Sequence, residues 1–336
     1  MIDIEHLSKH YPSPRGKPQV ILEDISLQVP AGSITAVVGP SGAGKSTLAK
    51  CISLLEKPSA GRILVEGIDL STLSGEALRR QRRLIGTVFQ SAALLQRKTV
   101  WENIALPLQW LGVVPRQIRS QVSQLLESVG LTDKAAAFPT QLSGGQQQRV
   151  GIARALALNP KVLLADEATS GLDPQATQSI IELLKRLREE YRLAIVLITH
   201  EMDVVRQAAD AVAYIEKGRL TQFGQIEHLL SRADSTLTDQ LFPLIPLASS
   251  KPIEVSLRYS DKMVTFDWIS RLGQQGIAVD ILAAHLENIA GCLVGRITIA
   301  VESSPQFNAD HFLAQLRQWG LHLDHPLPLT VLKEAG

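Results

Sequence analysis

The sequence has little of what marks secreted, membrane-spanning or nucleic-acid-binding proteins. It holds only 2 cysteines, 4% aromatic residues and a formal net charge of +1. Cys51 and Cys292 lack the spacing of a metal site, so we expect two buried, reduced thiols. No apolar run approaches the ~18 residues of a membrane span. The first residues, MIDIEHLSKHY, hold no apolar core of a secretory leader. A charge near zero gives no bulk attraction to nucleic acid or anionic lipid.

What is present is the composition of an ordinary folded chain. Hydrophobic residues make up 45% of the 336 positions and charged residues 20%, which excludes a disordered or collagen-like protein. At ~100–200 residues per domain, the length predicts two domains. A break rich in proline and serine divides them, and we expect a linker over residues 231–252. Its marks are Pro243, Pro246, Ser249, Ser250 and Pro252.

The first part, residues 1–230, alternates short apolar runs with helical patterns. Because these runs are apolar throughout, the strands would be buried on both faces, as in a largely parallel α/β sheet covered by helices. A helix-rich segment over about residues 100–155 predicts an inserted helical subdomain. Strands are expected over residues 20–29, 33–38, 162–165 and 194–198, and a helix over residues 44–55.

The second part, residues 253–336, predicts an α+β ferredoxin-like domain with the order βαββαβ. Apolar residues alternate at 253–257, and residues 279–286 and 293–301 are typical of two further strands. One helix is expected over 266–272, closed by Gly273, and another after a cap at Asn308. A last strand begins at Leu321, and residues 288–291 are expected to form a turn.

A phosphate-binding motif, G-x-x-x-x-G-K-[ST], occupies residues 39–46 and indicates the chemistry of the first part. It lies between a predicted strand and a predicted helix, so backbone N–H groups and the positive end of the helix would face phosphate oxygens. Lys45 would reach the β- and γ-phosphates, and the Ser46 hydroxyl would ligate Mg²⁺. The expected nucleotide-binding residues here are Gly39, Pro40, Ser41, Gly42, Ala43, Gly44, Lys45, Ser46 and Thr47.

Two further motifs complete the sequence pattern of a nucleotide hydrolase. The apolar run 162–165 ends in Asp166 and Glu167, which places Asp166 to hold Mg²⁺ and Glu167 to take a proton from the attacking water. Upstream, Leu142 and the residues Ser143, Gly144, Gly145 and Gln146 open a predicted helix, whose N-terminus again suits a phosphate.

In this order the motifs resemble the ATP-binding cassette (ABC) ATPases over residues 1 to about 230. The resemblance implies that Tyr11 stacks on adenine and that His200, in ITHE, is the switch histidine at the γ-phosphate. Gln90, in VFQS, matches the glutamine that contacts Mg²⁺ or water and senses a membrane partner. Asp173, in SGLD, matches the loop that links two sites across a dimer.

The family also implies a second copy of the chain. In ABC ATPases the LSGGQ segment of one subunit closes over the ATP held by the other, so the chain is expected to dimerise head to tail around two ATP molecules with Mg²⁺. Lys45, Gln90, Glu167 and His200 are then the catalytic residues, and Ser46, Gln90 and Asp166 the metal ligands. ATP binding would close the dimer, and hydrolysis would release it.

Within this family the chain looks most like the methionine-importer ATPases. The local matches are KSTLAKC at 45–51, LLEKP at 54–58, TVWENIALP at 99–107, DEAT at 166–169 and THEMDVV at 199–205. The resemblance implies uptake of methionine, as the D- or L-form. It also implies two integral-membrane permease subunits, a periplasmic or lipid-anchored substrate-binding protein, and a place on the cytoplasmic face of the inner membrane.

The resemblance leaves two interpretations of residues 253–336 open. In the methionine-importer family this domain binds intracellular methionine and inhibits transport. The chain departs from the family where residues 279–282 are mostly apolar, because asparagine is common there in the family. The other interpretation is a domain that only stabilises the dimer.

Other functions remain as alternatives at the level of sequence. The same ATPase could serve another amino-acid, peptide or lipoprotein transporter. A cassette ATPase acting on DNA or ribosomes is less favoured, because such proteins usually carry two cassettes, coiled-coil insertions or zinc modules, and no basic stripe marks nucleic-acid binding here.

Overall fold

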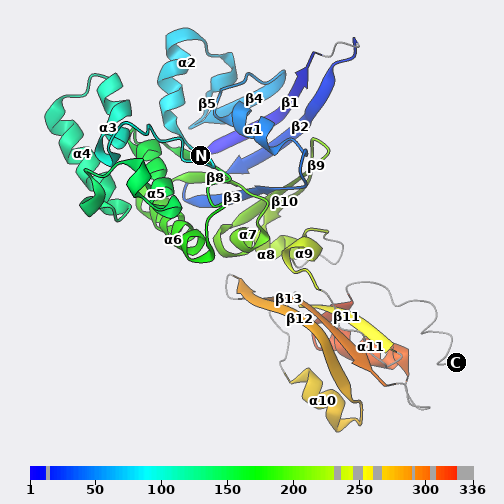
Figure 1. Cartoon of the computed structure of the whole chain (residues 1–336). Helices are drawn as coiled ribbons and strands as arrows, with labels where there is room; N and C mark the ends of the chain where they lie inside the picture. The colour runs from blue at the N-terminus through cyan, green and yellow to red at the C-terminus, as the bar shows by residue number, and fades with distance from the viewer. Residues whose placement is uncertain are drawn as a thin grey trace. The chain divides into compact units, whose positions relative to one another are not determined.

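The structure is a computed structural model that describes residues 1–12, 16–230, 236–244, 253–259, 267–289, 292–302 and 308–323. The chain forms two compact units, Met1–Gly224 and Gln225–Gly336 (Figure 1). Among the described residues, every helix is too short or too polar to cross a bilayer.

A six-stranded sheet with the order β10-β9-β3-β8-β7-β6 forms the centre of the first unit. Strand β3 pairs in parallel with β8 and β9, and β7 pairs in parallel with β6 and β8, which confirms the predicted parallel sheet. The strands are β3 (Ser33–Val38), β6 (Ile85–Val88), β7 (Val162–Asp166), β8 (Ala194–Ile198), β9 (Ala211–Glu216) and β10 (Arg219–Gln225).

Both faces of this sheet are buried, as the apolar runs predict. Along β8, Ile195 and Leu197 pack in the cluster that contains α5 (Gly144–Leu156) and α6 (Pro174–Tyr191). The alternate residues Val196 and Ile198 pack with α1 (Lys45–Ile52) and the second sheet. The strand period of 2 therefore serves two separate apolar cores.

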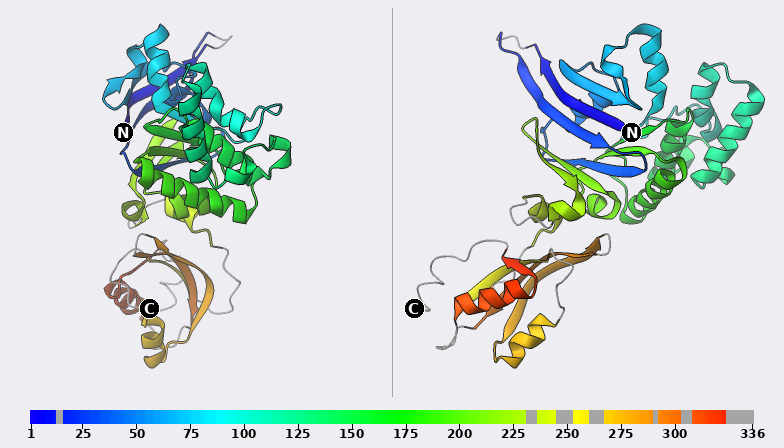
Figure 2. Two further views of the ribbon diagram at one scale, coloured as in Figure 1. Left: turned by 90° about the vertical axis from the view of Figure 1, so that its left-hand side faces the viewer. Right: turned by 180° about the vertical axis from the view of Figure 1, so that it is seen from behind.

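The second sheet is antiparallel and has the order β2-β1-β4-β5. Its strands are β1 (Ile2–Tyr11), β2 (Gln19–Val29), β4 (Ala60–Val65) and β5 (Ile68–Asp69). Figure 2 shows this sheet from two further sides. The first unit also contains two short helices, α2 (Gly75–Gln81) and α7 (Met202–Ala208).

The helical lobe lies on one side of the first unit, away from the antiparallel sheet (Figure 1 and Figure 2). It contains α3 (Val100–Trp110) and α4 (Pro115–Ser128), and α5 joins it to the central sheet. A capping box formed by Thr99 and Glu102 starts α3. Val122, Leu125 and Leu126 bury one face of α4, as their helical spacing predicts.

The C-terminal unit has the predicted order β11, α10, β12, β13, α11, β14. The sheet order is β12-β13-β11-β14, and neighbouring strands pair antiparallel. Trp268 and Phe312 from the two helices pack on one of its faces. The bounds are β11 (Ile253–Tyr259), α10 (Trp268–Gln274), β12 (Val279–Ile289), β13 (Cys292–Val301), α11 (Ala309–Gln318) and β14 (Leu321–Leu323).

Three details of this unit differ from the prediction. α10 continues through Gly273, and the left-handed residue after it is Gly276, with φ +78°. β12 extends to Ile289, into the turn expected at 288–291; residues 290 and 291 lie outside the described part, as do Phe266 and the side chain of Cys292. The segment expected as a linker contains α9 (Thr236–Leu241), while Ser249, Ser250 and the prolines at 246 and 252 lie outside the described residues.

Charge holds α9 against the C-terminal sheet. Asp239 Oδ1 lies 3.7 Å from Arg258 and 3.4 Å from Arg296, and both arginines are buried. These two residues are cross-strand neighbours on β11 and β13, so a carboxylate between them reduces the repulsion of two like charges. With α8 (Ile226–Leu230), this helix belongs to the unit that begins at Gln225.

Candidate active site

The phosphate loop lies between β3 and α1, and glycine geometry shapes it. Gly39 has φ +149°, and a Cβ there would collide with the carbonyl oxygen of Ile215. Gly44 is the N-cap of α1 with φ +105°, and a Cβ would lie 2.7 Å from Leu22 Cδ2. Only glycine fits both positions, so the loop can keep its backbone close to a phosphate at the helix N-terminus.

Lys45 is the first residue of α1, and its side chain is 8% exposed. Its Nζ donates hydrogen bonds to the carbonyl oxygens of Gly39, at 2.6 Å, and Pro40, at 3.0 Å. Burial lowers the pKa of Lys45, while the charges of Glu167 and Asp166 act in the opposite direction. The ammonium group is thus held at the loop, in reach of anionic oxygens.

Strand register brings the acidic residues to the same place. Ile198 of β8 pairs with Val37 of β3 on one side and with Asp166 of β7 on the other. Because the carboxyl ends of these parallel strands meet at one edge, Asp166 and Glu167 lie beside the phosphate loop. Burial and the charge of Glu167 raise the pKa of Asp166, against a smaller opposing effect of Lys45.

Glu167 has a left-handed backbone, with φ +51°. Its N–H donates to the carbonyl oxygen of Ile198 at 2.9 Å, and its Oε1 lies 3.2 Å from His200 Nδ1. A non-glycine residue in this conformation is uncommon and costs free energy, and such residues cluster at functional sites. The structure therefore brings together the two residues predicted as base and switch.

Gln90 follows β6 and approaches the same region. Its Nε2 donates to Ser170 Oγ at 3.2 Å, and the Ser170 N–H donates to the Glu167 carbonyl oxygen at 3.1 Å. The glutamine predicted as a metal contact is thus linked through Ser170 to the backbone of the predicted base.

Tyr11 ends β1, and its hydroxyl donates a hydrogen bond to Glu56. Lys9 Nζ lies 5.0 Å from the centre of the Tyr11 ring, and Glu56 raises the pKa of Tyr11 to about 12. Sequence reasoning missed the contact of Glu56. Nearby, burial raises the pKa of the Cys51 thiol to about 11, which fits the predicted buried, reduced thiol.

Ser143 is the N-cap of α5, and Gly144, Gly145 and Gln146 form its first turn. The Ser143 hydroxyl accepts from the Gln146 N–H at 3.3 Å, and Gln146 Oε1 accepts from the Ser143 N–H at 3.0 Å. Asp173 caps α6 in the same manner, through the Ala176 N–H at 2.9 Å. Within the described ranges no hydrogen bond joins these residues to residues 39–47.

Sequence reasoning also missed Gln148. Its side chain is 2% exposed and donates to the carbonyl oxygens of Phe89, at 3.1 Å, and Gln90, at 2.8 Å. In the sequence it belongs to a run of three glutamines, a pattern typical of a solvent-exposed helix face. Its burial depends on a loop 58 positions away, and the local pattern carries no signal of that contact.

The fold and the edge where β3, β8 and β7 end define an ATP-binding cassette. The family model described as "ABC transporter" matches residues 22–170, a range that contains the phosphate loop, Gln90, the LSGGQ segment and Glu167.

Similar proteins extend this likeness over nearly the whole chain. "Methionine import ATP-binding protein MetN 1" of Rhodococcus jostii is 47% identical over 326 residues, which cover 96% of this chain and 95% of that protein. "Methionine import ATP-binding protein MetN 2" of Yersinia pestis bv. Antiqua is 49% identical, over 89% of this chain and 92% of that protein. The chain belongs to the family of methionine import ATP-binding proteins.

Solved structures of cassette proteins match about two thirds of the chain. A dimeric, post-hydrolysis structure of the ATP-binding cassette MJ0796, bound to ADP and Pi, is 34% identical with a TM-score of 0.60 and covers 67% of this chain and 99% of that chain. The cbiO1 protein of Clostridium perfringens, part of an ABC transporter complex, is 30% identical with a TM-score of 0.63 and covers 71% and 94%.

The raised pKa of Asp166 leads to a prediction about stability. Asp166→Asn should raise the unfolding temperature of the nucleotide-free protein at neutral pH, because the ionised carboxylate is disfavoured by burial and by Glu167. The folded pKa lies above the unfolded value, so this penalty is fully present above the folded pKa and is lost as the pH falls through it. The gain should therefore shrink in acid.

Thermal unfolding of the wild type and the variant, followed by circular dichroism from neutral to acidic pH, checks this expectation. Asp133→Asn, at an exposed carboxylate, is the control and should show no comparable gain. An Asp166→Asn protein that unfolds at or below the wild-type temperature at neutral pH would show that the ionised Asp166 carboxylate does not destabilise the fold.

Proposed function

We propose that this chain is the ATP-hydrolysing subunit of an importer that takes up methionine, as the D- or L-form, through separate membrane subunits. The observation that carries the proposal is the meeting of Lys45, Asp166, Glu167 and His200 at one edge of the sheet. The substrate is inferred from the names of relatives that match over most of the chain.

The residues at this edge fit ATP and Mg²⁺. Gly42, with φ +78°, has open space where a Cβ would stand, and the loop N–H groups and Lys45 offer positive charge to the phosphates. The Ser46 hydroxyl, the Asp166 carboxylate and the Gln90 amide are oxygen donors, which Mg²⁺ prefers. When bound, Mg²⁺ would neutralise charge on the phosphate oxygens.

The protein groups divide the remaining work. Glu167 accepts the proton of the attacking water, and His200, 3.2 Å away, bears on the γ-phosphate and orients the glutamate. Lys45 stabilises the charge that develops on the phosphoryl oxygens. Tyr11, held by Glu56, stacks on the adenine.

A second copy of the chain completes each site. The LSGGQ segment forms the N-terminus of α5 and, in the part of the chain that the structure describes, makes no hydrogen bond to the phosphate loop of its own chain. A head-to-tail partner would supply Ser143, Gly144, Gly145, Gln146 and Asp173. Two observations support the dimer: among the described residues no hydrogen bond joins residues 143–146 to residues 39–47, and the similar cassette MJ0796 has dimeric structures.

Glu167→Gln tests the hydrolytic role. The variant should still bind ATP but lose about 10²–10⁴-fold in turnover, and it should form a dimer with ATP because closure is no longer followed by hydrolysis. Steady-state ATPase assays and size-exclusion chromatography with ATP measure both effects. Glu216→Gln, at the exposed end of β9, is the matched control. Wild-type turnover in the Glu167→Gln protein would contradict its role as the base.

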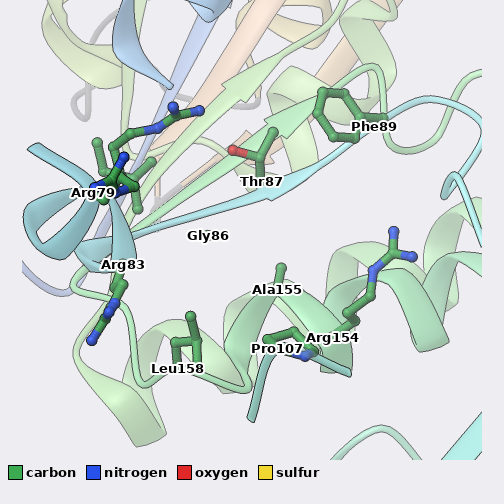
Figure 3. Close-up of a pocket in the computed structure, with 11 residues that line it drawn as sticks. Arg79, Arg83, Gly86, Thr87, Phe89, Pro107, Arg154, Ala155 and Leu158 are labelled. Carbon is green, nitrogen blue, oxygen red and sulfur yellow. The ribbon is translucent and has the colours of Figure 1, made fainter. Parts of the chain in front are cut away.

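A groove beside the glutamine loop supports a permease partner. It has a volume of about 370 Å³, and four of its lining residues are arginines with no acidic residue among them (Figure 3). Phe89, Thr87 and Pro107 bring the loop, the central sheet and the helical lobe to this groove. We infer that an acidic intracellular segment of each of the two permease subunits docks here, which places the chain peripherally at the cytoplasmic face of the inner membrane.

Charge reversal tests this docking. Arg83→Glu should weaken binding to the permease by about tenfold or more, because it sets like charges against each other, and should leave basal ATPase activity intact. Arg80→Glu is the matched control, since Arg80 lies on α2 but does not line the groove. Co-purification of co-expressed subunits reports both. Equal permease recovery with the two variants would exclude docking at this groove.

The proposal also assigns a role to the C-terminal unit and includes a substrate-binding protein as a further partner. A periplasmic or lipid-anchored protein delivers methionine, and intracellular methionine binds the C-terminal unit to inhibit transport. Calorimetry on the whole chain should detect L-methionine binding but not L-alanine binding. No heat at millimolar methionine would leave this unit with the dimer-stabilising role alone.

A further inference from the structure

One face of α5 holds the loop that carries Gln90. Gln148, almost fully buried, donates its two amide hydrogen bonds to the carbonyl oxygens of Phe89 and Gln90, at 3.1 and 2.8 Å. Gln148 thus holds the backbone of Gln90, and the side chain of the same Gln90 donates a hydrogen bond to Ser170.

Arg154 extends this grip along the same helix. Its guanidinium donates to the carbonyl oxygens of Ala92, at 2.6 Å, and Ala93, at 2.8 Å. Both alanines have left-handed backbones, with φ +52° and +45°, a conformation that persists only where surrounding contacts hold it. Between the two, a Cβ on Gly151 would lie 3.2 Å from Ala92 Cβ, so helix and loop are in close contact. Figure 3 shows Arg154 on α5 at the edge of the groove.

The other end of the same helix carries the LSGGQ segment. Added Cβ atoms at Gly144 and Gly145 would lie 3.2 Å from Leu172 and 3.0 Å from Ala176, so this end packs against the loop before α6 and against the first turn of α6. From Gly144 to Gln148 is four residues, or ~6 Å along a helix. One rigid turn therefore separates the segment that would meet the partner's nucleotide from the residue that holds Gln90.

We propose that Gln148 is a positioning residue that couples the two ATP sites of the dimer. In the head-to-tail arrangement, Gln90 serves the site on its own phosphate loop, whereas Ser143–Gln146 serve the site of the partner. Movement of the α5 N-terminus onto the partner's nucleotide is transmitted by Gln148 to the backbone of Gln90, and so to the metal ligands of the other site. This inference rests on the dimer proposed above.

Gln148→Met tests the coupling with a side chain of similar length that cannot donate. Gln147→Met is a matched control: Gln147 Nε2 also donates to two backbone carbonyl oxygens, of Pro139 at 3.1 Å and Leu142 at 3.2 Å, but neither hydrogen bond goes to the loop at residues 89–93. ATPase rates are measured against ATP and against Mg²⁺, with thermal unfolding of each variant.

The wild type and Gln147→Met should hydrolyse ATP with a Hill coefficient above about 1, and Gln148→Met should fall to about 1. The Mg²⁺ concentration for half-maximal rate should rise by about two- to thirty-fold in Gln148→Met only. A purely structural role would lower the unfolding temperature of both variants without this split. Arg154→Lys, which keeps the charge but cannot span both carbonyl groups, applies the same test if Gln148→Met does not fold.

Three outcomes overturn the proposal. One is unchanged cooperativity and Mg²⁺ dependence in Gln148→Met, and another is an equal change in Gln147→Met. The third is a wild type without cooperativity whose Glu167→Gln variant nevertheless dimerises with ATP, which removes the coupling and leaves the dimer intact. Failure of Glu167→Gln to dimerise would instead overturn the dimer, and the coupling with it.

Discussion

The register of three parallel strands is the constraint on which the site depends. Ile198 of β8 pairs with Val37 and with Asp166, so the phosphate loop, the acidic pair and His200 all emerge at one edge. A slip of one residue would turn Asp166 to the opposite face. The two apolar cores on either side of the sheet prevent such a slip, because it would expose buried side chains on both faces at once. Burial of the two apolar cores therefore fixes the register that places the acidic pair beside the phosphate loop.

The same burial disfavours the charged forms of Lys45 and Asp166 at the site. Lys45 is disfavoured as a cation by its burial and favoured by Glu167 and Asp166, while Asp166 is disfavoured as an anion by burial and by Glu167. Each charge thus depends on the others, and in a low-dielectric environment their interactions are strong. The left-handed backbone of Glu167 adds strain at the same edge. A bound polyphosphate with its cation would bring charges of both signs into this region, so the folded protein holds an arrangement that ligand binding can relax.

Sequence alone predicts the parts whose causes are local. The loop at residues 39–46 needs glycine at fixed places, and the βαββαβ order follows from apolar periodicity within each element. The contacts of Gln148 and Glu56 were not predictable, because their partners lie far along the chain and a buried glutamine has the same letter as an exposed one. Helix α9 was not predicted, because the prolines near it indicate a linker. The ion pairs of Asp239 were not predictable either, because Arg258 and Arg296 lie on later strands. The prediction that Gly273 ends α10 was wrong, because the helix continues to Gln274 and the left-handed residue is Gly276. A left-handed glycine after a helix is a local signal, and two glycines stood close enough to supply it.

Helix α5 shows why such long-range contacts matter for function. Its first turn carries the LSGGQ segment, its middle holds the Gln90 loop through Gln148, and Arg154 both grips that loop and lines the arginine-rich groove. Val150, Ile152 and Ala153 on the same helix are fully buried in the larger core, and a close-packed core moves as a body rather than deforming locally. We therefore expect a displacement of α5 at one of these three places to reach the other two. In the proposed dimer, this helix would connect the partner's nucleotide, the Gln90 loop and the groove, and a permease segment in the groove would respond to nucleotide without contacting it.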